Sequence, residues 1–112
     1  MKRMVIGTVA VVLFTAGIAS AQGNVEKGKQ VYTDQHCSMC HSIDGKGNPK
    51  GPLDDVGSKL TADQIRAWIT SPAEQAAKAK ADRKPPMPAK FASLPKADID
   101  ALVAYLSSLK KK

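Results

Sequence analysis

The clearest periodic pattern in the chain lies near its C-terminus, where apolar residues recur at the spacing of one helix face. The positions are Ile99, Leu102, Val103, Leu106 and Leu109. Steps of three and four residues keep them on one side of an α-helix. No stretch of the chain predicts a strand, so the pattern favours an all-α fold.

Local signals place the ends of this last helix. It is expected to begin at Leu94-Pro95, because proline is favoured at the first helical position. Asp98 in its first turn and the three lysines 110–112 at its end both match the helix dipole. Tyr105 is expected at the edge of the apolar stripe.

Residues 24–35 form a second predicted helix. Asn24 can cap its N-terminus, and its apolar face consists of Val25, Gly28, Val31 and Tyr32. A glycine inside a helix costs about 1 kcal/mol relative to alanine. Gly28 is therefore expected to permit close approach of another helix, the alternative being a glycine that is merely tolerated.

Two shorter helices are predicted in the middle of the chain. Thr61 and Gln64 form a capping-box pattern before a helix that ends near Thr70. The apolar face of this helix carries Ile65, Trp68 and Ile69. Pro72 begins a further, exposed helix that runs to about Ala81.

The remaining segments are predicted loops. Residues 42–59 are rich in glycine, proline, aspartate and lysine, and long loops of this kind are often functional or wrapped on a ligand. Residues 83–92 contain Pro85-Pro86-Met87-Pro88. Three prolines in four positions exclude a helix or a central strand, so this segment is expected to be extended and stiff.

The N-terminus predicts a secretory signal peptide over residues 1–21. Met1-Lys2-Arg3 is basic, residues 4–18 are almost wholly apolar, and Ala19-Ser20-Ala21 is a cleavage pattern. Cleavage after Ala21 and export to the periplasm are expected. Retention as an N-terminal anchor is the alternative, although the apolar run is shorter than the ~20 residues of a membrane span.

Composition points to a small domain that needs an additional stabilising element. Residues 22–112 contain four aromatic side chains, those of Tyr32, Trp68, Phe91 and Tyr105, which is little for a self-sufficient core. They carry 15 basic and 10 acidic residues. Their lysines are spread out and their arginines are only two, so nucleic-acid binding is excluded.

Both cysteines and one of the two histidines stand together in Cys37-Ser38-Met39-Cys40-His41. C-x-x-C-H is the attachment pattern of c-type haem. Two thiols three positions apart can each add to a haem vinyl group, and His41 can then bind the iron. One covalently attached haem c is therefore the predicted cofactor and the missing stabilising element.

The second iron ligand is predicted by elimination to be Met87. Met39 lies within the attachment pattern and His36 directly precedes it, so neither can reach the opposite face of the ring. Met87 is 46 residues after His41 in a proline-rich loop, which can hold a thioether–iron bond. Gap filling in the core is the alternative role. A His/Met pair raises the reduction potential.

Three other kinds of site fit these residues less well. A zinc site would need Cys37, Cys40, His36 and His41 as its four ligands, crowded within six residues. A thioredoxin-like disulfide exchanger would need a βαβ context. A peroxidase or gas sensor would need an open sixth iron position, which Met87 would close.

With these motifs, residues 22–112 resemble a class I monohaem cytochrome c of the bacterial periplasmic kind. The matching elements are the helix with Gly28 and Tyr32, the Cys37–His41 motif, Gly51-Pro52 with Leu53 after it, Trp68-Ile69 with Pro72, Pro86-Met87-Pro88 and Leu102–Leu106. The resemblance implies four to five short helices wrapped around the haem, with the N- and C-terminal helices crossing at Gly28 against Tyr105.

The resemblance also implies roles for two further site residues. The carbonyl group of Pro52 is expected to accept a hydrogen bond from Nδ1 of His41, which would orient the ring. Trp68 is expected near the haem edge or a propionate group, with plain core packing as an equal alternative.

The expected function is that of an electron carrier rather than an enzyme, shuttling single electrons between a reductase and a terminal acceptor. A dedicated cytochrome subunit of a larger redox complex is the alternative. Four lysines flank the predicted ligands and could form a docking face for acidic partner proteins: Lys46, Lys50, Lys84 and Lys90. Membrane contact is expected only through partners, unless the signal peptide is retained.

Overall fold

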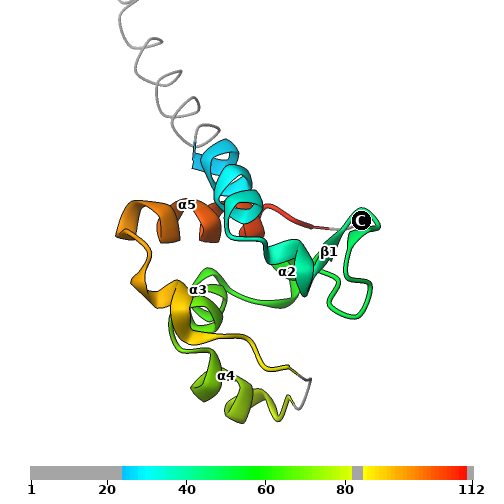
Figure 1. The fold of residues 1–112 in the computed structure, drawn as a ribbon, viewed down its shortest axis with the longest axis vertical. Coiled ribbons are helices and arrows are strands. Elements are labelled where there is room, and N and C mark those ends of the chain that lie inside the picture. The colour runs from blue at the N-terminus through cyan, green and yellow to red at the C-terminus, as the bar shows by residue number, and fades with distance from the viewer. Residues whose placement is uncertain (1–23, 82–84, 111–112) are drawn as a thin grey trace, which may run out of the picture.

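The computed structural model describes residues 24–81 and 85–110 of the 112-residue chain (Figure 1). The predicted signal peptide and Lys84 lie outside these ranges. Residues 24–34 form a helix, followed by the elements η1 (Cys37–Met39), β1 (Ser42–Ile43), β2 (Lys46–Gly47), α2 (Val56–Lys59), α3 (Ala62–Thr70), α4 (Pro72–Ala79), η2 (Ala89–Ser93) and α5 (Lys96–Ser107). Across the described ranges, no helix has both the length and the apolar character needed to span a membrane.

The mostly helical architecture confirms the predicted fold class, and α5 is its central element. Six of its twelve residues are buried, namely Ile99, Ala101, Leu102, Val103, Tyr105 and Leu106. All of them except Ala101 pack with Val31, Tyr32, Ile65, Ile69 and Phe91 into one core cluster. Tyr105, at the edge of the apolar stripe, is also buried, because helix 24–34 covers that side of α5 as the resemblance implied.

Helix 24–34 crosses α5 at Gly28, as predicted. A Cβ atom at Gly28 would lie 2.0 Å from the carbonyl oxygen of Ala101 and 2.6 Å from Cβ of Tyr105. Four residues along, the ring of Tyr32 meets the ring of Tyr105 edge to face, with 5.9 Å between centroids. Only glycine permits this backbone-to-backbone approach, so the packing interpretation of Gly28 is confirmed.

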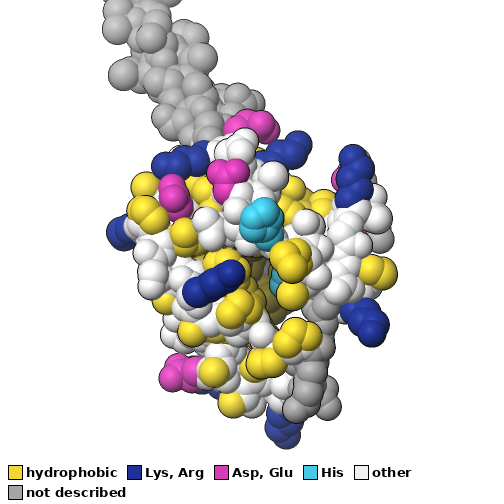
Figure 2. Space-filling model, in the orientation of Figure 1, with side chains coloured by type: hydrophobic (Ala, Val, Ile, Leu, Met, Phe, Trp, Pro, Cys, Tyr) yellow, Lys and Arg dark blue, Asp and Glu magenta, His cyan; other side chains and the backbone are white. Residues whose placement is uncertain are grey.

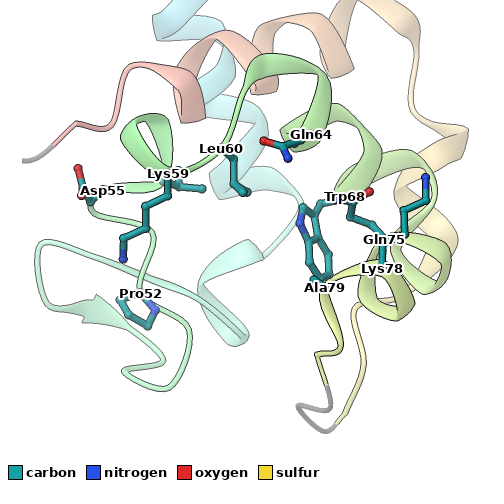
Figure 3. Close-up of a pocket in the computed structure, with 10 residues that line it drawn as sticks. Pro52, Asp55, Lys59, Leu60, Gln64, Trp68, Gln75, Lys78 and Ala79 are labelled. Atoms are coloured by element: carbon teal, nitrogen blue, oxygen red, sulfur yellow. The ribbon is translucent and has the colours of Figure 1, made fainter.

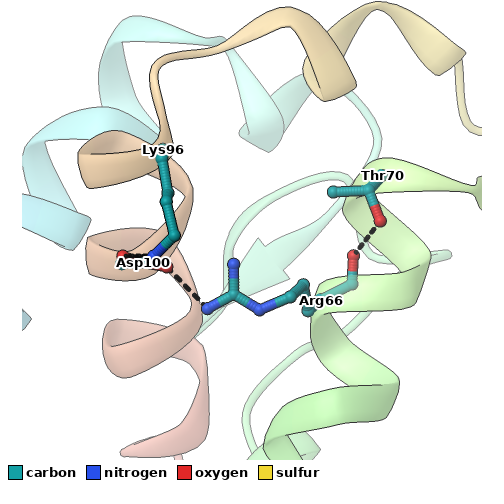
Figure 4. Close-up of polar contacts among 4 residues, drawn as sticks. All are labelled: Arg66, Thr70, Lys96 and Asp100. Atoms are coloured by element: carbon teal, nitrogen blue, oxygen red, sulfur yellow. Dashed lines mark hydrogen bonds and ion pairs between the residues drawn. The ribbon is translucent and has the colours of Figure 1, made fainter.

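The predicted capping box at α3 is present. The Thr61 hydroxyl accepts from the Gln64 amide, and the Gln64 side chain accepts from the Thr61 amide. Within α3, the Arg66 guanidinium donates a hydrogen bond to one carboxylate oxygen of Asp100 in α5 over 2.7 Å. The Lys96 ammonium donates to the other carboxylate oxygen (Figure 4). The Lys96 ammonium and the Arg66 guanidinium hold the pKa of Asp100 below its usual range. This network fixes α3 beside α5.

The predicted loop over residues 42–59 contains regular structure, and the expectation of no strand was wrong. β1 and β2 pair antiparallel, with Ser42 opposite Gly47. Asp44 and Gly45 between them both have positive φ, at 53° and 78°, which is the geometry of a two-residue hairpin turn. An Asp-Gly pair is a strong hairpin signal, but strands of two residues are too short to show alternation.

Two further expectations needed correction. Residues 89–93 form η2 with Phe91 buried, because the prolines end at Pro88 and leave the next residues free to turn. The helix α5 ends at Ser107, so both Leu109, which was predicted in its apolar stripe, and Lys110, which was predicted to complement its dipole, lie beyond its last turn. Lys111 and Lys112 lie outside the described residues.

Replacing Gly28 with alanine is expected to destabilise the protein by about 1–3 kcal/mol. The new methyl group would overlap the Ala101 carbonyl oxygen, which outweighs the higher helix propensity of alanine. Chemical denaturation of the purified holoprotein measures the change. The control is Lys29→Ala on an exposed position of the same helix, expected to change stability by less than about 0.5 kcal/mol. Equal effects of the two substitutions would contradict the close crossing.

The buried phenol of Tyr32 predicts a loss of stability at high pH. Burial is the main cause that raises the pKa of Tyr32 from 10.0 to about 12. The stability that this group contributes is therefore complete below pH 10 and is lost as the pH rises toward 12.

The Tyr32→Phe variant is expected to lose less stability than the parent protein between pH 9 and pH 11.5. The Tyr105 pKa, also raised by burial, leaves part of the decline in place. Near pH 7 the variant should be within about 0.5 kcal/mol of the parent, since the Tyr32 hydroxyl has no hydrogen-bond partner among the described residues. Denaturation curves over this pH range test both points, and identical slopes would contradict them.

Candidate functional site

The Cys37–His41 motif folds into a single tight turn directly after helix 24–34. His36 adopts a left-handed conformation with φ 56°, which ends the helix and redirects the chain into η1. The amides of Cys40 and His41 both donate to the carbonyl oxygen of Cys37, over 3.1 and 2.9 Å. The two thiols and the imidazole therefore originate from one compact turn of backbone.

The two cysteines are unpaired and half-buried. Burial raises the pKa of the Cys37 thiol to about 11, and the positive charge of Lys90 acts weakly in the opposite direction. A disulfide exchanger needs a thiol with a lowered pKa. The environment of Cys37 raises the pKa of its thiol instead of lowering it, which counts against the thioredoxin-like alternative.

Nδ1 of His41 donates to the carbonyl oxygen of Gly51 over 3.1 Å. The predicted acceptor was the carbonyl group of Pro52, one residue later, and that expectation is corrected. Ser42 bridges to Pro52, with the Ser42 amide donating to Gly51 and the Leu53 amide donating to Ser42. Successive carbonyl groups of an extended chain point to opposite sides, so the Gly51 carbonyl faces His41.

Asn48 holds the attachment turn in place through hydrogen bonds, and the sequence did not predict this role. Its amide donates to the carbonyl oxygens of His41 and Ser38, over 2.9 and 3.1 Å. Its side chain donates to the carbonyl oxygen of Met39 over 3.1 Å. An asparagine in a glycine- and proline-rich loop predicts only a turn, and no signal in the sequence assigns it this contact.

Pro52 and Trp68 line a pocket of about 520 Å³ from opposite sides (Figure 3). This volume lies within the ~300–1,000 Å³ typical of ligand sites. Apolar lining comes from Val56, Leu60 and Ala79, and polar lining comes from Asp55, Lys59, Gln64, Gln75 and Lys78. The polar lining residues were not anticipated. The pocket lining does not include Cys37, Cys40, His41 or Met87.

Met87 is half-buried between exposed prolines. Its side chain packs against the same core cluster as Cys37, Leu53, Leu60 and Leu94. The thioether of Met87 thus packs inward, which agrees with the predicted ligand role and equally with the alternative of gap filling in the core. Figure 2 shows one face of the molecule that is hollowed near its centre, with hydrophobic and histidine side chains around the hollow.

These features fit a covalently bound porphyrin. Two unpaired thiols and an imidazole oriented through Nδ1 stand on one turn, and half-buried apolar side chains face a nearby pocket. Lys59 and Lys78 on α2 and α4 supply positive charge for acidic substituents. In the described part of the chain, no group of three or more His, Cys, Asp and Glu side chains is placed to hold a bare metal ion.

Comparison with known proteins agrees with this site. The family model of cytochrome c matches residues 25–110. A curated relative, cytochrome c oxidase subunit 2 of Alkalihalophilus pseudofirmus, is 31% identical over 93 residues, which cover 75% of this chain and 25% of that protein. The chain thus spans about a quarter of the length of this relative. No solved structure matches.

The attachment turn, the crossing of helix 24–34 with α5 and the family match over most of the chain lead to one conclusion. The chain belongs to the cytochrome c family and carries covalently bound haem c.

Proposed function

We propose that this protein is a periplasmic electron carrier whose haem iron is held by His41 and Met87. Cys37 and Cys40 would form the two thioether bonds, and Pro52 and Trp68 would contact the ring or its substituents. The observation that carries the proposal is the attachment turn, with Nδ1 of His41 held by the Gly51 carbonyl. This hydrogen bond orients the ring and increases the basicity of Nε2, the nitrogen that would bind the iron.

A closed iron site favours electron transfer over catalysis. Bound haem supplies a one-electron couple between ferrous and ferric iron. A thioether from Met87 would occupy the position that a peroxidase or gas sensor keeps open. The prolines on both sides of Met87 limit the freedom of this loop, so the side chain can stay in place when the oxidation state changes.

A second role is favoured by the similarity to cytochrome c oxidase subunit 2. That relative is four times as long as the matched region, which indicates that a similar domain can be part of a larger redox protein. A dedicated cytochrome subunit of a complex is therefore the alternative function. Copurification with an oxidase under mild extraction would favour it over a free carrier.

The proposed location depends on the N-terminal segment. Residues 1–21 have the basic start, apolar run and small-residue cleavage pattern of a secretory signal, with cleavage after Ala21. Export agrees with the cofactor, since haem attachment of this kind takes place outside the cytoplasm. A retained segment would anchor the same domain to the membrane.

Replacing Met87 with alanine is expected to convert the low-spin spectrum of the holoprotein to a high-spin one. The variant should also bind added carbon monoxide in its reduced state, because the sixth position is open. Optical spectra of both oxidation states measure the change. The matched control is Met39→Ala, which removes an exposed thioether on the attachment turn and is expected to leave the spectrum unchanged. If the Met87→Ala protein stayed low-spin and did not bind carbon monoxide, Met87 would not be the iron ligand.

Lysines near the site are proposed to form a docking face for acidic partners. Lys46, Lys50 and Lys90 are exposed, and the influence of Lys90 on the Cys37 pKa places its charge close to the attachment turn. Lys46 and Lys50 flank Asn48, which binds that turn. Lys84 lies outside the described residues.

The triple variant Lys46→Gln, Lys50→Gln, Lys90→Gln is expected to slow oxidation of the reduced holoprotein by hexacyanoferrate(III). A several-fold loss at low ionic strength follows from weaker attraction of the anion, and it should shrink as salt is added. Stopped-flow spectroscopy measures the rates. A cationic cobalt(III) complex as oxidant and a Lys29→Gln variant serve as controls. Equal slowing with both oxidants would contradict a cationic face at the site.

A further inference from the structure

The segment 51–57 connects the imidazole of His41 to the C-terminal end of α5. At one end, the Gly51 carbonyl oxygen accepts from Nδ1 of His41 over 3.1 Å and from the amide of Ser42 over 3.0 Å. At the other end, the amide of Gly57 donates to the carbonyl oxygen of Leu109 over 2.8 Å. Both ends are thus fixed through backbone atoms.

The contact at Gly57 is as close as the helix crossing at Gly28. A Cβ atom at Gly57 would lie 2.2 Å from the carbonyl oxygen of Ser107 and 2.9 Å from that of Leu109. The Ser107 hydroxyl is buried and has no hydrogen-bond partner among the described residues. The contact therefore has no room for a side chain at position 57.

The chain between the two ends is ordered. The Leu53 amide donates to Ser42 over 2.8 Å, and the Val56 amide donates to Leu53 over 3.2 Å. In addition, the Asp54 carboxylate accepts from the amide of Asp44 in the hairpin. Because packed, hydrogen-bonded segments move as units rather than deform, a shift at Gly57 is transmitted to the Gly51 carbonyl.

We propose that Gly57 is a positioning residue for His41, acting through the Gly51 carbonyl. The backbone contact of α2 with Ser107–Leu109 sets the hydrogen bond at Nδ1 and, through it, the basicity of the ligand nitrogen. The inference rests on the proposed role of His41 as an iron ligand. It would make the C-terminal end of α5 a determinant of the reduction potential.

The test is Gly57→Ala in the holoprotein. Alanine normally improves a helix relative to glycine by about 1 kcal/mol, so any loss comes from the overlap with Ser107. The exchange of the His41 Nδ1 proton with solvent is followed by NMR in the reduced, histidine-labelled protein, relative to the slowest backbone amides of α5. The exchange is expected to be at least tenfold faster in the variant. The reduction potential should rise, because a less basic imidazole favours the ferric state less.

The matched control is Gly28→Ala, which introduces a similar overlap against the middle of α5, away from the segment 51–57. It should lower stability without changing the normalised exchange of Nδ1 or the potential. Lost stability in Gly57→Ala with unchanged exchange and potential would make Gly57 a purely structural residue and overturn the proposal.

A gentler variant covers the case in which Gly57→Ala does not yield holoprotein. Leu109→Ala removes a half-buried side chain and loosens the same contact from the other side. A smaller acceleration, of a few-fold, is expected, and its absence would also overturn the proposal. Parent spectra without histidine ligation would instead refute the proposed function, so the two failures are distinguishable.

Discussion

The structure depends on the close approach of backbone segments to α5. At Gly28 the space for a side chain is filled by Ala101 and Tyr105, and at Gly57 it is filled by Ser107. The first contact fixes helix 24–34 against the middle of α5, and the second fixes the segment 51–57 against the C-terminal end of α5. A chain with few aromatic side chains thereby gains a defined core at two glycine positions, and only the second contact is proposed to act on His41.

The attachment turn is held by backbone and amide groups rather than by a large core of its own. Asn48, Gly51 and the carbonyl oxygen of Cys37 satisfy the polar groups of residues 38–42. The turn brings the thiols of Cys37 and Cys40 and the imidazole of His41 together on one short stretch of backbone. The iron chemistry belongs to the cofactor, and the proposed contribution of the chain is to orient one ligand, close the opposite face and surround the ring with apolar side chains.

Residues with strong local or chemical signals were predicted well from the sequence. The capping box of Thr61 and Gln64, the start of α4 at Pro72, the stripe of α5 and the packing of Gly28 are all present. The family match supports the haem predicted from Cys37–His41. Ligation of the iron by Met87 stays a prediction.

The errors concern tertiary contacts that leave no periodic trace. Gly51 replaces Pro52 as the acceptor because a bridge to Ser42 decides which carbonyl faces His41. In the sequence, Asn48 and Gly57 are typical loop residues. Their roles come from the tertiary contacts that Asn48 makes with the attachment turn and Gly57 makes with residues 107–109. The hairpin was missed because its strands contain two residues each.

The central claim is that the haem iron is closed by Met87 opposite His41. The most direct measurement is the NMR spectrum of the reduced holoprotein with methyl-labelled methionine, since a thioether bound to iron lies directly above the ring and its methyl signal is shifted far upfield. The account predicts one such signal that disappears in the Met87→Leu variant, with the Met39 methyl group at its ordinary position. Ordinary positions for both methyl groups would contradict the account.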